Sequence, residues 1–261
     1  MALTCFAVLL GASASAQAPT FPCKPVAEFP HDQAAFTQGL FVVGERIYES
    51  SGGYGTSFLA IYDLDTGDQI RRHDLDPRHF AEGIAPYRDE LASLTWRSGF
   101  GFFHDLRTLK PLAHFSYRSG GDPVEAWGLA FDGAHFIMSD GSDRLLFHKP
   151  ETFERIRMLR VRDGRKTVRR LNELEYANGF LLANIWKTDR LAVIDLATGW
   201  VNAWIDLSPL RERLAPRSGT ANGVAYDRAG GRLLVTGKGW DKIFAIEVDD
   251  SVWRPLEALE E

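Results

Sequence analysis

Five similar four-residue strings recur along the chain, and the second residue of each has a side chain suited to chemistry or binding. The strings begin at Thr37, Ala81, Ala126, Leu171 and Ala221, and their second residues are Gln38, Glu82, Trp127, Asn172 and Asn222. A further set follows these by 12 to 16 residues and comprises Ser50, Ser51, Trp96, Asp140, Trp186 and Lys238. Together the two sets offer an acid–base carboxylate, amide donors, an ammonium group and three indoles.

This mixture of side chains fits a ligand site better than a purely structural centre. A carboxylate such as Glu82 can move a proton, and the Lys238 ammonium can stabilise a developing negative charge. The three indoles can enclose a ligand and exclude water from it. Each tryptophan taken alone fits a wedge in the core equally well, but three at equivalent positions favour a shared cage. We therefore expect one site with an aromatic cage, an acid–base group and oxyanion donors.

The spacing of the strings indicates the elements that bring these residues together. Their second residues are 44, 45, 45 and 50 positions apart, and short β-branched and aromatic runs broken by Gly, Asp and Asn lie between them. Such runs predict an all-β chain, and a repeat of this length with about four strands predicts a five-bladed β-propeller. The start of an innermost strand and the end of the next, antiparallel strand lie at one end of their hairpin. The two sets should therefore ring one mouth of the central axis.

The last repeat indicates how the ring closes. Three strands are recognisable there, over residues 223–226, 232–236 and 242–248, and the fourth is missing. A spare strand over residues 25–29 precedes the first repeat, and it can complete the last blade and remove a sheet edge. The basic stretch 155–170 largely alternates over residues 155–162, which favours a solvated outer strand over an anion-binding patch.

Composition and the start of the chain bound the cellular context. The 261 residues carry a net charge of −5, which argues against a general affinity for nucleic acid or anionic membranes. An apolar run over residues 4–10, followed by small residues ending in Ala16-Gln-Ala18, fits a signal peptide and is too short to span a membrane. We expect residues 1–18 to be removed on export to the periplasm or the cell exterior, and residues 19–261 to form one domain. Cys23 would then lack a disulfide partner within the chain.

Ten short motifs carry a family resemblance. They are FTQGL from Phe36, YESSG from Tyr48, FAEGI from Phe80, LTW from Leu94, WGL from Trp127, SDGS from Ser139, LNELE from Leu171, ANIW from Ala183, NG from Asn222 and TGKGW from Thr236. In this order, from about Phe36 to Val248, they resemble the plant and bacterial type of glutaminyl-peptide cyclotransferase (glutaminyl cyclase). The resemblance implies a five-bladed propeller, unrelated to the zinc-dependent animal cyclases.

The resemblance also implies roles for individual residues. Glu82 matches the catalytic glutamate, and the substrate pocket is matched by Phe36, Gln38, Phe80, Trp96, Trp127, Asn172, Trp186 and Lys238. The implied reaction converts an N-terminal glutamine to pyroglutamate and releases ammonia, with Glu82 as proton shuttle and Lys238 and Asn172 as oxyanion donors. Ala81 stands where the family usually has glycine, and a left-handed backbone at this position would be strained.

The implied enzyme acts on peptides or proteins with an N-terminal Gln, needs no cofactor for catalysis and is expected to be a monomer. No residue is assigned to a metal, and the sequence leaves open a structural divalent cation in the central channel. Two other functions also stay open: a non-catalytic propeller that binds peptide or sugar on its tryptophans, and a metal-dependent hydrolase such as a lactonase. The hydrolase would need several axial carboxylates, whereas the second residues of the strings include only Glu82.

Overall fold

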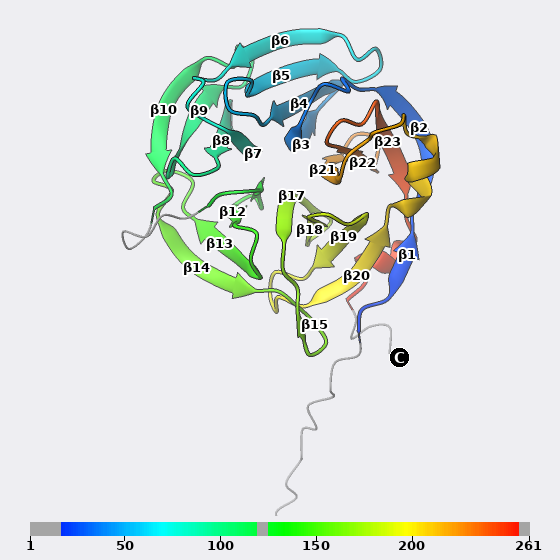
Figure 1. Ribbon diagram of the computed structural model, residues 1–261. Helices are drawn as coiled ribbons and strands as arrows, with labels where there is room; N and C mark the ends of the chain where they lie inside the picture. Colours follow the sequence, from blue (N-terminus) through cyan, green and yellow to red (C-terminus); the bar gives the residue numbers. More distant parts are fainter. Residues whose placement is uncertain (1–16, 119–124, 256–261) are drawn as a thin grey trace, which may run out of the picture.

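Five sheets surround a central axis like the blades of a propeller (Figure 1), in a computed structural model that describes residues 17–118 and 125–255. This architecture confirms the predicted all-β, five-bladed fold. In each of the first four blades the strands follow the chain outward, so the innermost strand begins at or just after a recurring string.

The first three blades have four strands each. The first blade contains β3 (Thr37–Val43), β4 (Arg46–Ser51), β5 (Phe58–Asp63) and β6 (Gln69–Asp74). The second contains β7 (Ala81–Tyr87), β8 (Glu90–Thr95), β9 (Phe100–Asp105) and β10 (Pro111–Ser116). The third contains β11 (Leu129–Phe131), β12 (Phe136–Ser139), β13 (Arg144–His148) and β14 (Arg155–Arg160).

The last two blades combine strands from both ends of the chain. The fourth contains β17 (Leu171–Ala177), β18 (Phe180–Ile185), β19 (Arg190–Ile194), β20 (Val201–Asp206) and β1 (Thr20–Pro22). The fifth contains β21 (Ala221–Asp227), β22 (Arg232–Gly237), β23 (Lys242–Glu247) and β2 (Lys24–Pro30). A small hairpin of β15 (Arg162–Asp163) and β16 (Lys166–Thr167) and two 3₁₀ turns, η1 (Ser208–Arg213) and η2 (Asp250–Trp253), lie outside the blades.

The innermost strands approach one another closely at the axis. A Cβ atom on Gly83 would lie 2.4 Å from the main-chain nitrogen of Leu129, and one on Gly128 would lie 2.0 Å from the main-chain oxygen of Asn172. Neither position has room for a side chain. Glycine at the third place of the string therefore allows neighbouring blades to meet.

The fourth string has Glu173 at this third place, and its side chain links three blades. The carboxylate accepts hydrogen bonds from the main-chain N–H of Leu40 at 3.3 Å and of Val224 at 2.8 Å. Burial raises the pKa of Glu173 well above its ordinary value, and both N–H donors oppose that rise. One carboxylate thus joins β17 to β3 and β21.

The N-terminal segment closes the ring, as the sequence predicts. Strand β2 pairs antiparallel with β23 and completes the fifth blade, with Glu28 opposite Phe244. The sequence did not predict β1, which pairs parallel with the outer strand β20 of the fourth blade. Between the two strands, the Cys23 N–H donates to the Asp206 carbonyl at 3.0 Å. Residues 20–30 therefore hold two adjacent blades together.

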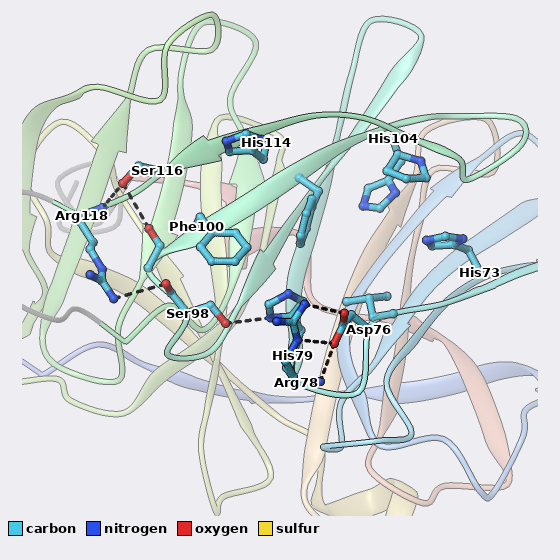
Figure 2. Close-up of a pocket in the computed structure, with 14 residues that line it drawn as sticks. His73, Asp76, Arg78, His79, Ser98, Phe100, His104, His114, Ser116 and Arg118 are labelled. Atoms are coloured by element: carbon cyan, nitrogen blue, oxygen red, sulfur yellow. Dashed lines mark hydrogen bonds and ion pairs between the residues drawn. The ribbon is translucent and has the colours of Figure 1, made fainter.

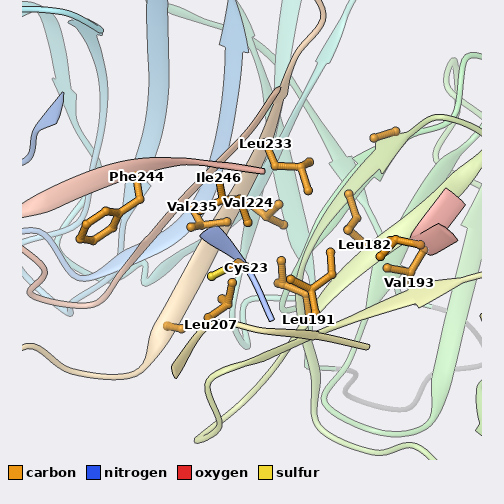
Figure 3. Packing of buried hydrophobic residues seen from close by; sticks show 14 of the residues in the cluster. Cys23, Leu182, Leu191, Val193, Leu207, Val224, Leu233, Val235, Phe244 and Ile246 are labelled. Atoms are coloured by element: carbon orange, nitrogen blue, oxygen red, sulfur yellow. The ribbon is translucent and has the colours of Figure 1, made fainter. Parts of the chain in front are cut away.

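Apolar side chains fill the space between blades. Figure 3 shows this packing between the fourth and fifth blades, where Leu191 and Val193 of β19 lie in one cluster with Val235 of β22 and Ile246 of β23. Cys23 is buried in the same cluster, and burial raises the pKa of its thiol to about 12. The cysteine therefore acts as a small apolar side chain.

A buried ion pair lies at the seam between the last and first blades. His31 follows β2, and its Nε2 lies 3.2 Å from Oε1 of Glu49 on β4. The same oxygen accepts from the Thr37 hydroxyl at 2.7 Å, and His31 Nδ1 lies 2.7 Å from the Trp240 carbonyl. Burial lowers the pKa of His31, but Glu49 outweighs it, so that the net pKa is raised. An imidazolium that donates to both partners explains this geometry.

The outer surface bears on the expectation for the basic stretch 155–170. Strand β14 pairs with β13 alone and is largely exposed, which confirms a solvated outer strand in the basic stretch. Within the described residues no helix is long and apolar enough to cross a membrane. Of the predicted signal peptide, residues 1–18, the part from residue 1 to residue 16 lies outside the described residues. Ala18 is buried, and its N–H donates to Asp163 at 2.7 Å.

The His31–Glu49 pair gives the closure a pH dependence. Because the folded-state pKa of His31 is raised, its stabilising effect is fully present below the unfolded value of about 6.5 and is lost as the pH rises through the folded value. Glu49→Gln should therefore lower the free energy of unfolding by about 3 kcal/mol near pH 6, and by less at higher pH. Urea unfolding of both proteins across this range measures the difference.

The control is Glu154→Gln, which makes the same change in an exposed pair with Lys149. It should alter the free energy of unfolding by less than about 0.5 kcal/mol at every pH. A Glu49→Gln effect that stayed constant with pH would contradict a protonated His31 at the seam.

Candidate active site

The predicted residues meet at one end of the axis. Gln38, Glu82, Asn172 and Asn222 each occupy the second place of an innermost strand, and Trp127 comes shortly before β11. Trp96, Trp186 and Lys238 directly follow β8, β18 and β22, the strands that return to the same end. The structure therefore brings the two sequence sets to one mouth.

Irregular pairing explains how the second residue of a string is aimed at the mouth. In four blades the register shifts at the start of the innermost strand, between Thr37 and Gly39, Ala81 and Ile84, Leu171 and Leu174, and Ala221 and Val224. Such a bulge leaves a residue unpaired and redirects its side chain, and bulges are frequent beside functional sites. Gln38, Glu82, Asn172 and Asn222 each lie within one of these shifts.

Aromatic side chains form two walls of the mouth. On one side the Phe80 ring lies 6.2 Å from Phe36 and 5.7 Å from Trp96, measured between ring centres. Tyr54 also lies on this wall, 5.5 Å from Phe80. On the other side Trp127 and Trp186 meet edge to face at 5.5 Å. Sequence analysis did not identify Tyr54.

Glu82 is a buried carboxyl whose charged form is disfavoured. Burial raises its pKa well above the ordinary value; the Lys238 charge and a hydrogen bond from Gln38 oppose the rise, and Glu125 adds to it. The main-chain oxygen of Glu82 accepts from the Ser50 hydroxyl at 2.6 Å, which fixes the strand beneath the side chain. A buried carboxyl with a raised pKa beside a charged partner is a candidate for general acid–base catalysis.

The backbone before Glu82 does not require glycine. Ala81 is buried, and its φ is not positive, so its backbone is not left-handed. Its N–H donates to the Ser57 hydroxyl at 2.9 Å. The condition for strain is therefore not met, because the backbone at Ala81 is not left-handed. Alanine therefore fits the position where the resemblance implies glycine.

Lys238 is the cationic member of the site. Burial lowers its pKa to about 8, and the Glu82 charge acts in the opposite direction. The ammonium lies 4.3 Å from the centre of the Phe36 ring, and the main chain of Lys238 exchanges hydrogen bonds with Gly219 and Thr220 at 2.8 and 3.0 Å. The loop backbone and the ring thus fix the direction of the amine.

Glu125 was missed by sequence reasoning. Its Oε2 accepts hydrogen bonds from the indole N–H groups of both Trp96 and Trp127 at 3.1 Å, and Arg97 binds its other oxygen at 2.6 Å. Burial raises the pKa of Glu125, but these three donors outweigh it and hold the pKa below its ordinary value. A single carboxylate therefore joins the two aromatic walls. It precedes the third string, and no equivalent residue recurs in the other repeats.

Other members of the two sequence sets have structural partners. The Asn222 amide donates to the Thr37 carbonyl at 2.9 Å, and the Ser51 hydroxyl accepts from the Phe36 N–H at 2.9 Å. Asp140 is bound by Arg144. These contacts hold the three side chains in the wall of the mouth, and the Asn222 side-chain oxygen has no hydrogen-bond partner among the described residues.

The axial carboxylates do not form a metal-binding set. Glu173 and Glu175 lie on β17, and their oxygens accept from main-chain N–H groups of β3 and β21. Burial raises the pKa of Glu175 to about 8. Over residues 17–118 and 125–255, no group of three His, Cys, Asp or Glu side chains is arranged to hold a metal ion.

Comparisons with known proteins bear on this site. A family model described as glutamine cyclotransferase matches residues 1–248. The glutaminyl-peptide cyclotransferase of Arabidopsis thaliana is 38% identical over 229 residues, which cover 85% of this chain and 70% of the relative. The crystal structure of Myxococcus xanthus glutaminyl cyclase superposes with a TM-score of 0.81 at 31% identity, covering 89% of this chain and 99% of that one.

The opposed influences on Glu82 can be measured directly. Lys238→Met removes the positive charge that lowers the pKa of Glu82, so the pKa should rise further, whereas Glu125→Gln should lower it. The measurement is ¹³C NMR titration of labelled glutamate carboxyl groups, with Glu82→Gln to assign the signal. A Glu82 signal that titrates near the ordinary value of about 4.3, unchanged by either substitution, would refute a buried site.

Proposed function

The chain belongs to the glutamine cyclotransferase family, and from this premise we propose that it converts the N-terminal glutamine of peptides and proteins to pyroglutamate with release of ammonia. The observation that carries the proposal is Glu82, a buried carboxyl with a raised pKa, electrostatically coupled to Lys238 within aromatic walls. This arrangement supplies the groups that the reaction requires.

The reaction makes one bond and breaks another. The substrate α-amine attacks the carbon of its own γ-carboxamide, a C–N bond closes the five-membered lactam, and the original amide nitrogen leaves as ammonia. An α-amine has a pKa of about 8 and is mostly protonated at neutral pH, so it must lose a proton before it attacks. The leaving nitrogen must gain one.

Glu82 serves both proton transfers in sequence. As a carboxylate it accepts the proton of the attacking amine, and as the resulting acid it protonates the leaving nitrogen. Burial raises the pKa of Glu82, so the carboxyl holds the transferred proton more readily than an exposed glutamate would. Gln38, whose side chain hydrogen-bonds the carboxylate, holds it in position between the two nitrogens.

Lys238 and Asn172 stabilise the negative charge that develops on the amide oxygen. Lys238 keeps its proton at neutral pH because its pKa is lowered only to about 8. Asn172 is buried in the same mouth and presents an amide donor. Donors that are fixed in a water-poor site act strongly on developing charge.

The aromatic walls supply positioning. Phe36, Phe80 and Trp96 form one aromatic wall of the mouth, and Trp127 and Trp186 form the other. The walls would hold the flexible glutamine side chain folded back on its own amine. The chain would then lose its conformational entropy on binding, and the free energy of activation would be lower than for the free peptide. Glu125 keeps two of these rings in place through their indole N–H groups.

The proposal also includes the metal requirement, the oligomeric state and the cellular location of the enzyme. Every step above is assigned to side chains of this chain, so we propose metal-independent catalysis by a monomer. We also propose export with cleavage near Ala18, because small residues follow the apolar run there. A non-catalytic peptide-binding propeller is the competing function, and it would not require Glu82.

Ammonia release from a Gln-initiated dipeptide tests the activity. The free α-amine and the γ-carboxamide are both reactants, so acetyl-Gln, Asn-initiated and Glu-initiated peptides should not be turned over. Activity should survive dialysis against a chelator. Turnover of acetyl-Gln at a comparable rate would indicate a general amidase, and loss of activity that zinc restores would indicate metal chemistry.

Glu82→Gln separates catalysis from folding. Three of the other four strings carry an amide at the same place, so the variant should unfold at nearly the wild-type temperature. Removing general acid–base catalysis costs about 10²–10⁴-fold, and one group that serves two transfers should lie toward the upper end. Steady-state kcat and KM, beside a melting curve, test this. A folded variant that keeps more than about a tenth of kcat would exclude Glu82 as the proton shuttle.

A further inference from the structure

A groove of about 840 Å³ lies between the first two blades, outside the axial mouth. Its residues come from β6 and the loop after it, and from β9 and the loop before it. The others come from β10 and from Arg118, which lies two residues after β10. Figure 2 shows its side chains, including His79, Ser98, Phe100 and Arg118. The volume lies within the range of small-molecule and peptide pockets, and the mechanism above does not use it.

The groove opens on the same face of the propeller as the mouth. The ends of β6, β8 and β10 and the starts of β7 and β9 all lie at this face, because neighbouring strands in each blade are antiparallel. The residues Asp76, His79, Ser98, Ser116 and Arg118 lie at this end of the groove. His104 and Pro111 lie at the far ends of β9 and β10.

Two loops form a thin wall between groove and mouth. In the loop before β7, Phe80 packs on Trp96 in the mouth, while the adjacent His79 packs on Phe100 in the groove with 5.2 Å between ring centres. In the loop before β9, Trp96 belongs to the mouth, while Ser98 meets His79 Nδ1 at 3.1 Å in the groove. A chain that leaves the mouth over this wall enters the groove directly.

The lining is aromatic with a surplus of positive charge. Asp76 is the one carboxylate among the described lining residues, and Arg78 occupies both of its oxygens at 2.9 and 2.8 Å. Arg118 is exposed and donates to the Ser98 carbonyl at 3.4 Å. Its guanidinium lies against Gly99, where a Cβ atom would be 1.9 Å from Nε. A guanidinium has five N–H donors, so Arg118 can still bind a carboxylate.

We propose that this groove binds the downstream part of a peptide substrate and favours an acidic side chain there, with Arg118 as its partner and Phe100 and Phe102 as the apolar floor. The proposal rests on the proposed function, because it takes the substrate chain to leave the mouth beyond its first residue. The groove then adds selectivity among Gln-initiated peptides without touching the reacting atoms.

The test compares kcat/KM for Gln-initiated peptides of equal length that carry either Glu or Lys at successive downstream positions. At one or more positions the wild type should favour Glu on the order of fivefold at low salt. Arg118→Glu should reverse this preference. Ser116→Trp, which fills the exposed end of the groove, should weaken turnover of longer peptides only. A Gln dipeptide should be processed equally by all three proteins.

Arg107→Glu is the matched control, because Arg107 is exposed in the turn between β9 and β10 at the opposite face and its substitution changes the net charge equally. It should leave the preference intact. Equal rates for Glu and Lys peptides, or an Arg118→Glu loss shared by the dipeptide, would overturn the groove proposal while the activity stood. A wild type that released no ammonia from the dipeptide would overturn both.

Discussion

Glu82 and Lys238 carry opposite charges in a place from which water is largely excluded, and burial disfavours the charged form of each. Their attraction opposes this effect on both sides, so the pKa of Glu82 rises well above its ordinary value and that of Lys238 falls to about 8. The pKa values of the two groups are therefore closer together than those of an exposed glutamate and an exposed lysine. The surrounding structure maintains this burial.

Maintaining the burial requires tight packing at the axis. Glycine at Gly83 and Gly128 lets the innermost strands meet without side chains between them. The bulges at four of the strand starts turn the second residue of those strings toward the mouth. In the fourth blade a carboxylate replaces the glycine, and Glu173 binds main-chain N–H groups of two other blades. Neighbouring blades are thus joined at the axis by close main-chain approach at the glycines and by side-chain hydrogen bonds at Glu173.

Ring closure and the active mouth are physically connected. His31 follows the closing strand β2 and contacts both Glu49 and the Trp240 carbonyl, and Trp240 is two residues from Lys238. Glu49 in turn holds the Thr37 hydroxyl, next to Gln38. The strand that joins the two ends of the chain therefore also supports two side chains of the site. A separate carboxylate, Glu125, links the two aromatic walls through the indole N–H groups of Trp96 and Trp127.

The sequence by itself determined the features that repeat. The period of the strings and the missing last strand predicted five blades and closure by β2, and antiparallel pairing placed Glu82, Trp96, Trp186 and Lys238 at one mouth. Only the tertiary structure decided the contacts that occur once, such as Glu125 with two indoles, His31 with Glu49 and the groove beside Arg118. Each joins residues far apart in the chain with no periodic signal. The pKa of Glu82 also depends on burial by all the blades together, a property that no local pattern contains.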